Sequence, residues 1–122
     1  MAHNPGFLKL VNEAKARVKE IDLAGYQKMR DAGEEHLLVD TREESEWAAG
    51  HVAGAVHLSK GIIERDIETK VPDKSTKLVL YCGGGFRSAL VADNLRQMGY
   101  ENAISLDGGW RALKESGIKL ER

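Results

Sequence analysis

The segment from Lys77 to Ala92 restricts the possible folds of this chain more than any other feature. It runs from an apolar stretch, Leu78 to Tyr81, through Cys82 and three consecutive glycines into residues with helical spacing. A β-type run, a tight loop and a helical start in direct succession are typical of a strand-to-helix unit. This arrangement places the thiol of Cys82 at the carboxyl end of a strand, below the backbone amides of a loop and of a helix N-terminus.

Cys82 is the only cysteine in the chain. Loop amides and the helix dipole favour a negative charge, so we expect them to favour the thiolate form at this position. The alternative is an inert core cysteine, but an inert residue does not need glycines that let the backbone come close to a bound anion. A single cysteine excludes an intramolecular disulfide and an internal resolving thiol. The sequence therefore predicts a free, reactive thiol, which suits a reducing compartment.

Composition limits the class of protein. The chain has 122 residues, a formal net charge of −1 and 42% hydrophobic residues, which predicts one globular domain and gives no reason to expect a nucleic-acid partner. The N-terminus lacks a basic region followed by an apolar stretch, and no apolar run approaches the length of a membrane span, so we expect a cytoplasmic protein without membrane contact. The four histidines and one cysteine show no metal-ligand spacing. We therefore predict neither a metal site nor a cofactor.

Strands and helices are expected to alternate along the chain. Helical spacing of Phe7, Val11, Ala14, Val18 and Ile21, with Pro5 near the start, predicts a helix over residues 5–20 that packs on its own domain, the alternative being a docking helix. Further helices are predicted from the Asp22 N-cap to Met29, at 59–69, at 88–98 and at 110–115, and strands at 37–39, 55–58, 78–81 and 103–106. This order implies right-handed crossovers and a parallel sheet. Ligands bind at the carboxyl ends of such strands, where both Cys82 and Asp40 fall.

Three stretches carry motifs in a fixed order. Residues 40–58 contain an Asp-x-Arg, a Glu-aromatic and a Gly-His-x-x-Gly-Ala pattern, the Cys82 loop ends in Arg87-Ser88, and residues 99–110 end in Gly-Gly-aromatic. Together they resemble the rhodanese family of sulfurtransferases over roughly residues 20–117. The resemblance implies an α/β fold in three layers, with a central parallel five-stranded sheet and helices on both faces. It also divides the chain into an N-terminal helical extension, residues 1–19, and a rhodanese domain, residues 20–122.

The resemblance further implies an activity. In rhodaneses the loop cysteine attacks the sulfane sulfur of a donor such as thiosulfate, keeps it as a persulfide and passes it to cyanide or a thiol. The expected partners are therefore a small sulfur donor and a cyanide or thiol acceptor, or a sulfur-accepting protein. Cys82 is the predicted nucleophile. The persulfide would be held by the amides of the loop and helix start, which are those of Gly83, Gly84, Gly85, Phe86, Arg87 and Ser88.

Other residues receive supporting interpretations. The guanidinium of Arg87 suits an anionic donor, although it could instead pair with Asp40 or face solvent. Asp40 and Arg42 are expected to hold the site in shape, and His51 to bond backbone in a turn. Phe86, taken as a loop residue, would set donor access beside the thiol, and Trp110 would pack or line the mouth of the site.

Two other classes of function remain open. Cysteine phosphatases use Cys-x5-Arg, whereas Cys82 and Arg87 form Cys-x4-Arg, a ring better suited to a single sulfur atom than to a phosphate. A non-catalytic binding module usually lacks the cysteine. Within the sulfurtransferase class, the domain could mainly carry a persulfide for a partner, because Gly83, Gly84 and Glu46 stand where two-domain thiosulfate enzymes commonly have basic residues.

Overall fold

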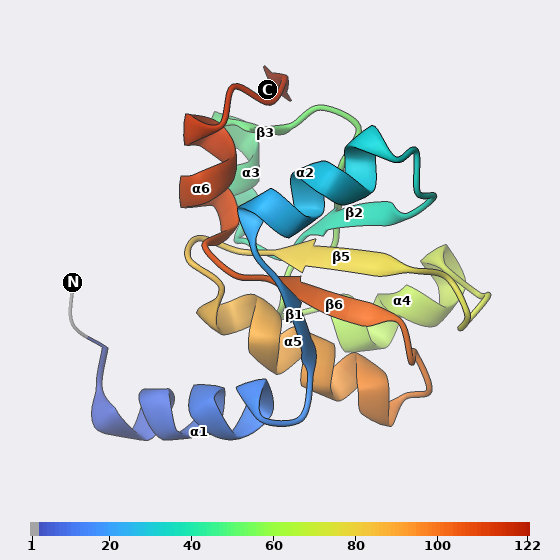
Figure 1. Cartoon of the computed structure of the whole chain (residues 1–122). Helices are drawn as coiled ribbons and strands as arrows, with labels where there is room; N and C mark the ends of the chain where they lie inside the picture. Colours follow the sequence, from blue (N-terminus) through green and yellow to red (C-terminus); the bar gives the residue numbers. More distant parts are fainter. Residues whose placement is uncertain (1–2) are drawn as a thin grey trace.

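A five-stranded parallel sheet forms the centre of the molecule. The computed structural model describes residues 3–122 (Figure 1). The strands lie in the order β1-β6-β5-β2-β4, and every neighbouring pair is parallel. Their bounds are Lys19–Ile21 for β1, Leu37–Asp40 for β2, Val56–His57 for β4, Leu78–Tyr81 for β5 and Ala103–Leu106 for β6. The predicted α/β class with a parallel five-stranded sheet is confirmed.

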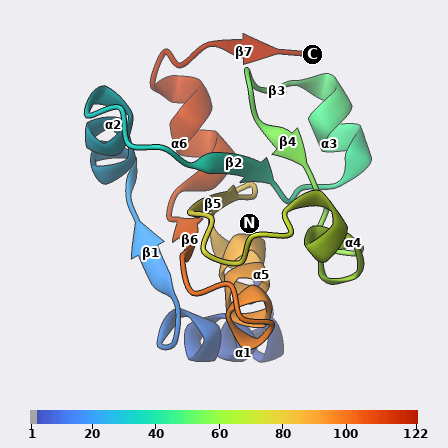
Figure 2. The ribbon, with the colours of Figure 1, turned by 90° about the vertical axis from the view of Figure 1, so that its right-hand side faces the viewer.

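Helices cover both faces of this sheet (Figures 1 and 2). Helices α4, Ile63–Lys70, and α5, Phe86–Gln97, lie on one face, and α2, Leu23–Asp31, and α6, Gly109–Glu115, lie on the other. The side chains of β5 alternate accordingly: Leu78 and Leu80 join the α4/α5 cluster, whereas Val79 and Tyr81 join the α2/α6 cluster. Two buried apolar layers thus enclose the sheet, as a three-layer α/β fold requires.

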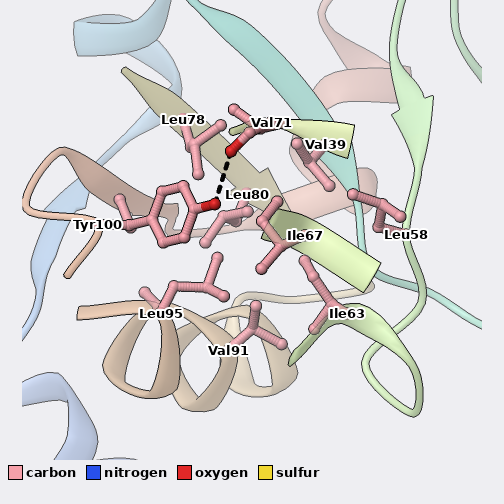
Figure 3. Packing of buried hydrophobic residues seen from close by; sticks show 12 residues of the cluster. Val39, Leu58, Ile63, Ile67, Val71, Leu78, Leu80, Val91, Leu95 and Tyr100 are labelled. Atoms are coloured by element: carbon pink, nitrogen blue, oxygen red, sulfur yellow. Dashed lines mark hydrogen bonds between the residues drawn. The ribbon is translucent and has the colours of Figure 1, made fainter. Parts of the chain in front are cut away.

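The α4/α5 cluster is shown in Figure 3. Leu80, Ile67 and Leu95 are fully buried within it. Tyr100 is also fully buried, and its hydroxyl donates a hydrogen bond to the carbonyl of Val71 at 2.6 Å. This cluster fixes α5, and with it the loop that leads from β5 into α5.

The first helix is shorter than its pattern predicts. Helix α1 spans Pro5–Lys15, and the chain then turns into β1 rather than continuing as helix to residue 20. The apolar spacing persists through Val18 and Ile21, but Ile21 pairs with Leu106 of β6 in the sheet. Pairing with β6 overrides the local helical preference there, since it satisfies the backbone of residues 19–21.

Three short elements have no counterpart in the sequence expectations. Helix α3 spans Glu44–Ala49, and β3, His51–Val52, pairs antiparallel with β7, Leu120–Glu121. Elements of two to six residues carry too few positions for a periodic pattern to show them.

Over residues 3–122, none of the helices combines the length and apolar character needed to cross a bilayer. Within the same residues, no three acidic, histidine or cysteine side chains are grouped closely enough to hold a metal ion.

Candidate active site

Cys82 lies immediately after β5, at the floor of a pocket with a volume of about 720 Å³. Cys82 is only 1% exposed, and it lines this pocket together with Gly83, Gly84 and Arg87. The Sγ atom accepts hydrogen bonds from the backbone amides of Gly85, at 3.2 Å, and Ser88, at 3.3 Å. Two amides directed at one sulfur form a cradle for a thiolate or for the outer sulfur of a persulfide.

Gly85 gives the loop its shape. It adopts φ +101°, and a Cβ there would lie 3.3 Å from backbone atoms of Leu106, Asp107 and Gly108. Gly109 is tighter still, because with φ +47° its Cβ would lie 2.3 Å from the carbonyl oxygen of Cys82. The turn after β6 therefore packs directly against the cysteine, and Trp110 donates its amide hydrogen to that same carbonyl at 2.7 Å.

A chain of hydroxyls leads from the sulfur into the sheet. The Cys82 thiol lies 3.5 Å from Ser88 Oγ, which lies 2.8 Å from Ser105 Oγ. Both serines are fully buried, Ser88 on α5 and Ser105 on β6. When the sulfur is ionised, the Ser88 hydroxyl can donate to it while accepting from Ser105.

Arg87 faces the pocket but is paired. Its Nη1 and Nη2 atoms bond to the two carboxylate oxygens of Glu46 at 2.9 and 3.3 Å. This bidentate pair lowers the pKa of Glu46 and raises that of Arg87, because each group stabilises the charged form of the other. The alternative partner considered from the sequence, Asp40, does not contact Arg87, whose carboxylate partner is Glu46 on α3.

Asp40 and Arg42 lie in the interior beside the site. The Asp40 carboxylate accepts from the amide and guanidinium of Arg42, at 2.7 Å for the shortest contact, and Arg42 also donates to the carbonyl of Gly50 at 2.6 Å. Arg42 lies over the ring of Trp110, 4.3 Å from its centroid. Neither residue lines the Cys82 pocket. Their contacts join the end of β2 to the Gly50 carbonyl after α3 and to Trp110 of α6.

Two expectations about neighbouring residues are settled by the geometry. His51 Nδ1 bonds to the backbone carbonyl of Trp47 at 2.9 Å and its ring stacks on Trp47, as expected, but His51 begins strand β3 and does not lie in a turn. Trp110 packs on Tyr81 and Arg42 and does not line the pocket. The loop assignment of Phe86 was wrong, because Phe86 is the first residue of α5, but it does line the pocket.

With this geometry in place, comparison with known proteins is informative. The family model described as "Rhodanese-like domain" matches residues 22–116. The chain belongs to the rhodanese-like domain family. The match contains every predicted site residue of the chain and leaves α1 outside.

Individual relatives of this rhodanese-like domain agree with the family match. A Bacillus subtilis protein named "Putative sulfurtransferase YtwF" is 36% identical over 95 residues, which cover 78% of this chain and 89% of that protein. "Thiosulfate sulfurtransferase GlpE" of Pseudomonas entomophila is 37% identical over 79 residues, covering 62% of this chain and 71% of that protein. Among solved structures, a Rhodopseudomonas palustris protein of unknown function, described as a possible tyrosine phosphatase, has a TM-score of 0.84. It is 26% identical, and the alignment covers 99% of this chain and 98% of that one.

Sequence reasoning missed several residues around the pocket of this rhodanese-like domain. Arg111, His3 and Phe7 line it together with Glu46 and residues of the loop, and Ser105 lies behind it; of these, only Glu46 was noted in the sequence, though not as the partner of Arg87. Arg111 has a visible signal, since it follows the Gly-Gly turn by two residues. His3 and Phe7 have none, because only the packing of α1 on α5 brings them to the pocket.

Proposed function

We propose that this chain is a sulfurtransferase that moves a sulfane sulfur from a donor such as thiosulfate to cyanide or a thiol through a persulfide on Cys82. The observation that carries the proposal is the Cys82 sulfur at the floor of an open pocket, accepting hydrogen bonds from the amides of Gly85 and Ser88. Membership of the rhodanese-like family and relatives named as sulfurtransferases support it.

The reaction follows from nucleophilic catalysis by a thiolate. The ionised Sγ attacks the outer sulfur of thiosulfate, a new S–S bond forms, and the bond to the sulfonyl sulfur breaks with its electron pair leaving on sulfite. The acceptor then attacks the outer sulfur of the persulfide, and the electron pair of that S–S bond returns to Sγ as thiolate. Cyanide leaves as thiocyanate and a thiol as a persulfide, which covers both a small-molecule acceptor and a sulfur-accepting protein.

Each part of the site has a role in this proposal. The amides of Gly85 and Ser88 stabilise the negative charge on Sγ as the amide cradle, and the small residues Gly83 and Gly84 leave the entrance open. Arg87 attracts the anionic donor, and its ion pair with Glu46 weakens this attraction. Asp40 and Arg42 position the loop through the end of β2, where Thr41 donates to the carbonyl of Tyr81 next to the cysteine.

Intact mass spectrometry tests the proposal directly. Mixing the protein with thiosulfate should add one sulfur, about 32 Da, to the wild type, cyanide should remove it, and Cys82→Ser should show no gain. Mass gain in Cys82→Ser would contradict the assigned nucleophile. Absence of any gain, with thiosulfate or with a small organic persulfide, would favour a binding module.

A phosphatase assay belongs beside it, because one structural relative carries that description. The loop from Cys82 to Arg87 is one residue shorter than a phosphatase loop, so we expect no hydrolysis of p-nitrophenyl phosphate. Hydrolysis that depends on Cys82 would overturn the proposed function.

A further inference from the structure

Three aromatic rings form one wall of the Cys82 pocket, and two of them come from outside the family match. The His3 ring lies 4.5 Å from the Phe86 ring and 5.3 Å from the Phe7 ring, centroid to centroid, and Phe7 lies 6.3 Å from Phe86. All three residues line the pocket that contains the sulfur. We call His3, Phe7 and Phe86 the aromatic wall.

The wall is held in place by α1. Phe7, Val11 and Ala14 lie on one face of this helix, and Val11 and Ala14 are buried, at 0% and 1% exposure. Just beyond the helix, the Arg17 guanidinium binds both carboxylate oxygens of Asp93 on α5, at 2.7 Å for the shortest contact. An anchored helix therefore presents Phe7 to the pocket, and His3 lies two residues before the helix begins, with its ring against Phe7 and Phe86.

The size of the pocket exceeds the needs of a small inorganic donor. Its volume of about 720 Å³ falls within the range of roughly 300–1,000 Å³ typical of sites for drug-sized organic ligands. Thiosulfate would leave most of it, including the aromatic wall, unfilled. A donor with an apolar group would bury that group against the rings.

The charged residues around the pocket also favour a donor other than thiosulfate. Arg87 is neutralised by Glu46. Lys15, whose Nζ lies 5.6 Å from the Phe86 ring centroid, is balanced by Glu20 and Asp107. Arg111 is the only pocket-lining cation that has no ion-pair partner within residues 3–122. One uncompensated cation matches one negative charge better than the two charges of thiosulfate.

We propose that the natural donor is a monoanionic organic sulfane compound with an aromatic or other bulky apolar group, selected by the aromatic wall and Arg111. This inference rests on the proposed function and names its substrate class. With an arylthiosulfonate, the Cys82 thiolate attacks the terminal sulfur and an S–S bond forms. The bond between the two donor sulfurs breaks, and its electron pair leaves on the arylsulfinate, so the charges balance as they do for thiosulfate.

Two matched probes test this selection. Benzenethiosulfonate and methanethiosulfonate carry the same charge and the same reacting sulfur, and differ in the apolar group. We expect kcat/KM, followed as thiocyanate released in the presence of cyanide, to favour the benzene compound by about 10-fold in the wild type. Phe7→Ala and His3→Ala should each reduce that preference roughly 3-fold, since each removes one ring contact.

The chain offers a control on the same helix. Leu10 lies on the outer face of α1, 59% exposed and away from the pocket, so Leu10→Ala should leave the preference unchanged. Arg111→Gln should lower kcat/KM for both probes by a similar factor, because both are monoanions.

The possible results distinguish the selection of donors by the aromatic wall from sulfur transfer through Cys82. Equal kcat/KM for the two probes, or a preference that survives the double variant His3→Ala/Phe7→Ala, overturns the aromatic selection while sulfur transfer stands. If no donor adds sulfur to Cys82, the proposed function fails, and the substrate class falls with it.

Discussion

Two buried serines extend the amide cradle of Cys82 into the sheet. Ser88 donates its amide hydrogen to Sγ and places its hydroxyl 3.5 Å from it, and Ser105 holds that hydroxyl at 2.8 Å. A hydroxyl with a fixed partner is oriented before the sulfur ionises, which stabilises the thiolate without further reorganisation. Ser105 therefore acts on the reaction only through Ser88.

A double-mutant cycle tests this order. Ser88→Ala should slow persulfide formation roughly 10-fold, corresponding to the loss of one charge-assisted hydrogen bond, and Ser105→Ala about 3-fold. The double variant should be no slower than Ser88→Ala alone, because removing Ser88 already breaks the chain. Rapid-quench mass spectrometry measures the rate. Additive losses would mean that Ser105 acts independently of Ser88.

The ion pair of Glu46 and Arg87 is expected to hold thiosulfate turnover below what the pocket could support. Glu46→Gln removes a carboxylate from the edge of the pocket and leaves Arg87 free, so kcat/KM for thiosulfate should rise roughly 3-fold at low salt, a gain limited by the partial exposure of both groups. Steady-state thiocyanate formation measures it. Glu44→Gln, an exposed residue on the same helix, provides the matched control. An unchanged or lower rate in Glu46→Gln would show that the carboxylate does not restrain Arg87.

For single residues, the sequence predicted Cys82 and its glycine loop, but it did not predict which side chains contact them. The loop is local in the chain, so the glycines around Cys82 could be interpreted together. The partner of Arg87 is Glu46, which is far away in the sequence, and any of many carboxylates could have filled that place. Ser105 gave no signal, because a serine in a strand is ordinary until the neighbouring helix is known to place a second hydroxyl against it.

Among the elements, the β6–α6 turn controls the shape of the cysteine loop. Gly109 allows no side chain, since its Cβ would overlap the carbonyl of Cys82, and its φ of +47° is unfavourable for other residues. Gly109→Ala should cost about 3 kcal/mol of unfolding free energy and distort the amide cradle. Gly117 also has positive φ, at +85°, but open space around its Cβ position. Gly117→Ala should cost only about 1 kcal/mol and keep full sulfur transfer. Urea unfolding compares the two, and equal losses would show that backbone strain alone decides the cost at Gly109.

Helix α1 is joined to α5 by an ion pair whose strength depends on pH. Arg17, with a smaller effect from Arg96, lowers the pKa of Asp93 in the folded protein. A lowered folded pKa contributes stability above the unfolded value of about 3.9 and loses it as pH falls through the folded pKa. Asp93→Asn should therefore reduce the unfolding free energy by about 1 kcal/mol at pH 7, a value limited by the exposure of both arginines. The difference from the wild type should begin to shrink as the pH falls below about 3.9 and should disappear only below the lowered folded pKa of Asp93. A difference that is constant with pH in urea titrations would point to lost packing instead of lost charge.

The elements that were predicted correctly are those with a strong pattern of their own. The strands at residues 78–81 and 103–106 lie where expected, because a short apolar run bounded by turn residues is a local signal. Strand β1 was instead taken as the end of a helix. Only its pairing with β6 makes it a strand, and that pairing is not visible in residues 19–21.

For the molecule as a whole, the open question is whether α1 belongs to the domain or extends it. The family match begins at residue 22, yet α1 has Val11 and Ala14 buried, and the segment before β1 supplies His3 and Phe7 of the aromatic wall. The sheet and both apolar clusters are built without any residue of α1. We therefore propose that the chain divides just before β1 into two parts. The N-terminal extension shapes the pocket, and the remaining domain folds without it and carries out sulfur transfer on Cys82.

Removing residues 1–16, which keeps Arg17 and its bond to Asp93, tests this division. The shortened chain should fold, with a loss of about 3 kcal/mol from the burial of Val11, Ala14 and their neighbours on the helix. It should still take a sulfur from thiosulfate on Cys82, since the amide cradle and Arg87 remain. Its preference for benzenethiosulfonate over methanethiosulfonate should fall toward that of the His3→Ala/Phe7→Ala variant, because both changes remove the same two rings. Circular dichroism melting and the thiocyanate assay measure the two effects separately. A shortened chain that does not fold would place α1 inside the domain, and one that keeps the full preference would leave the selection of donors to Phe86 and the loop alone.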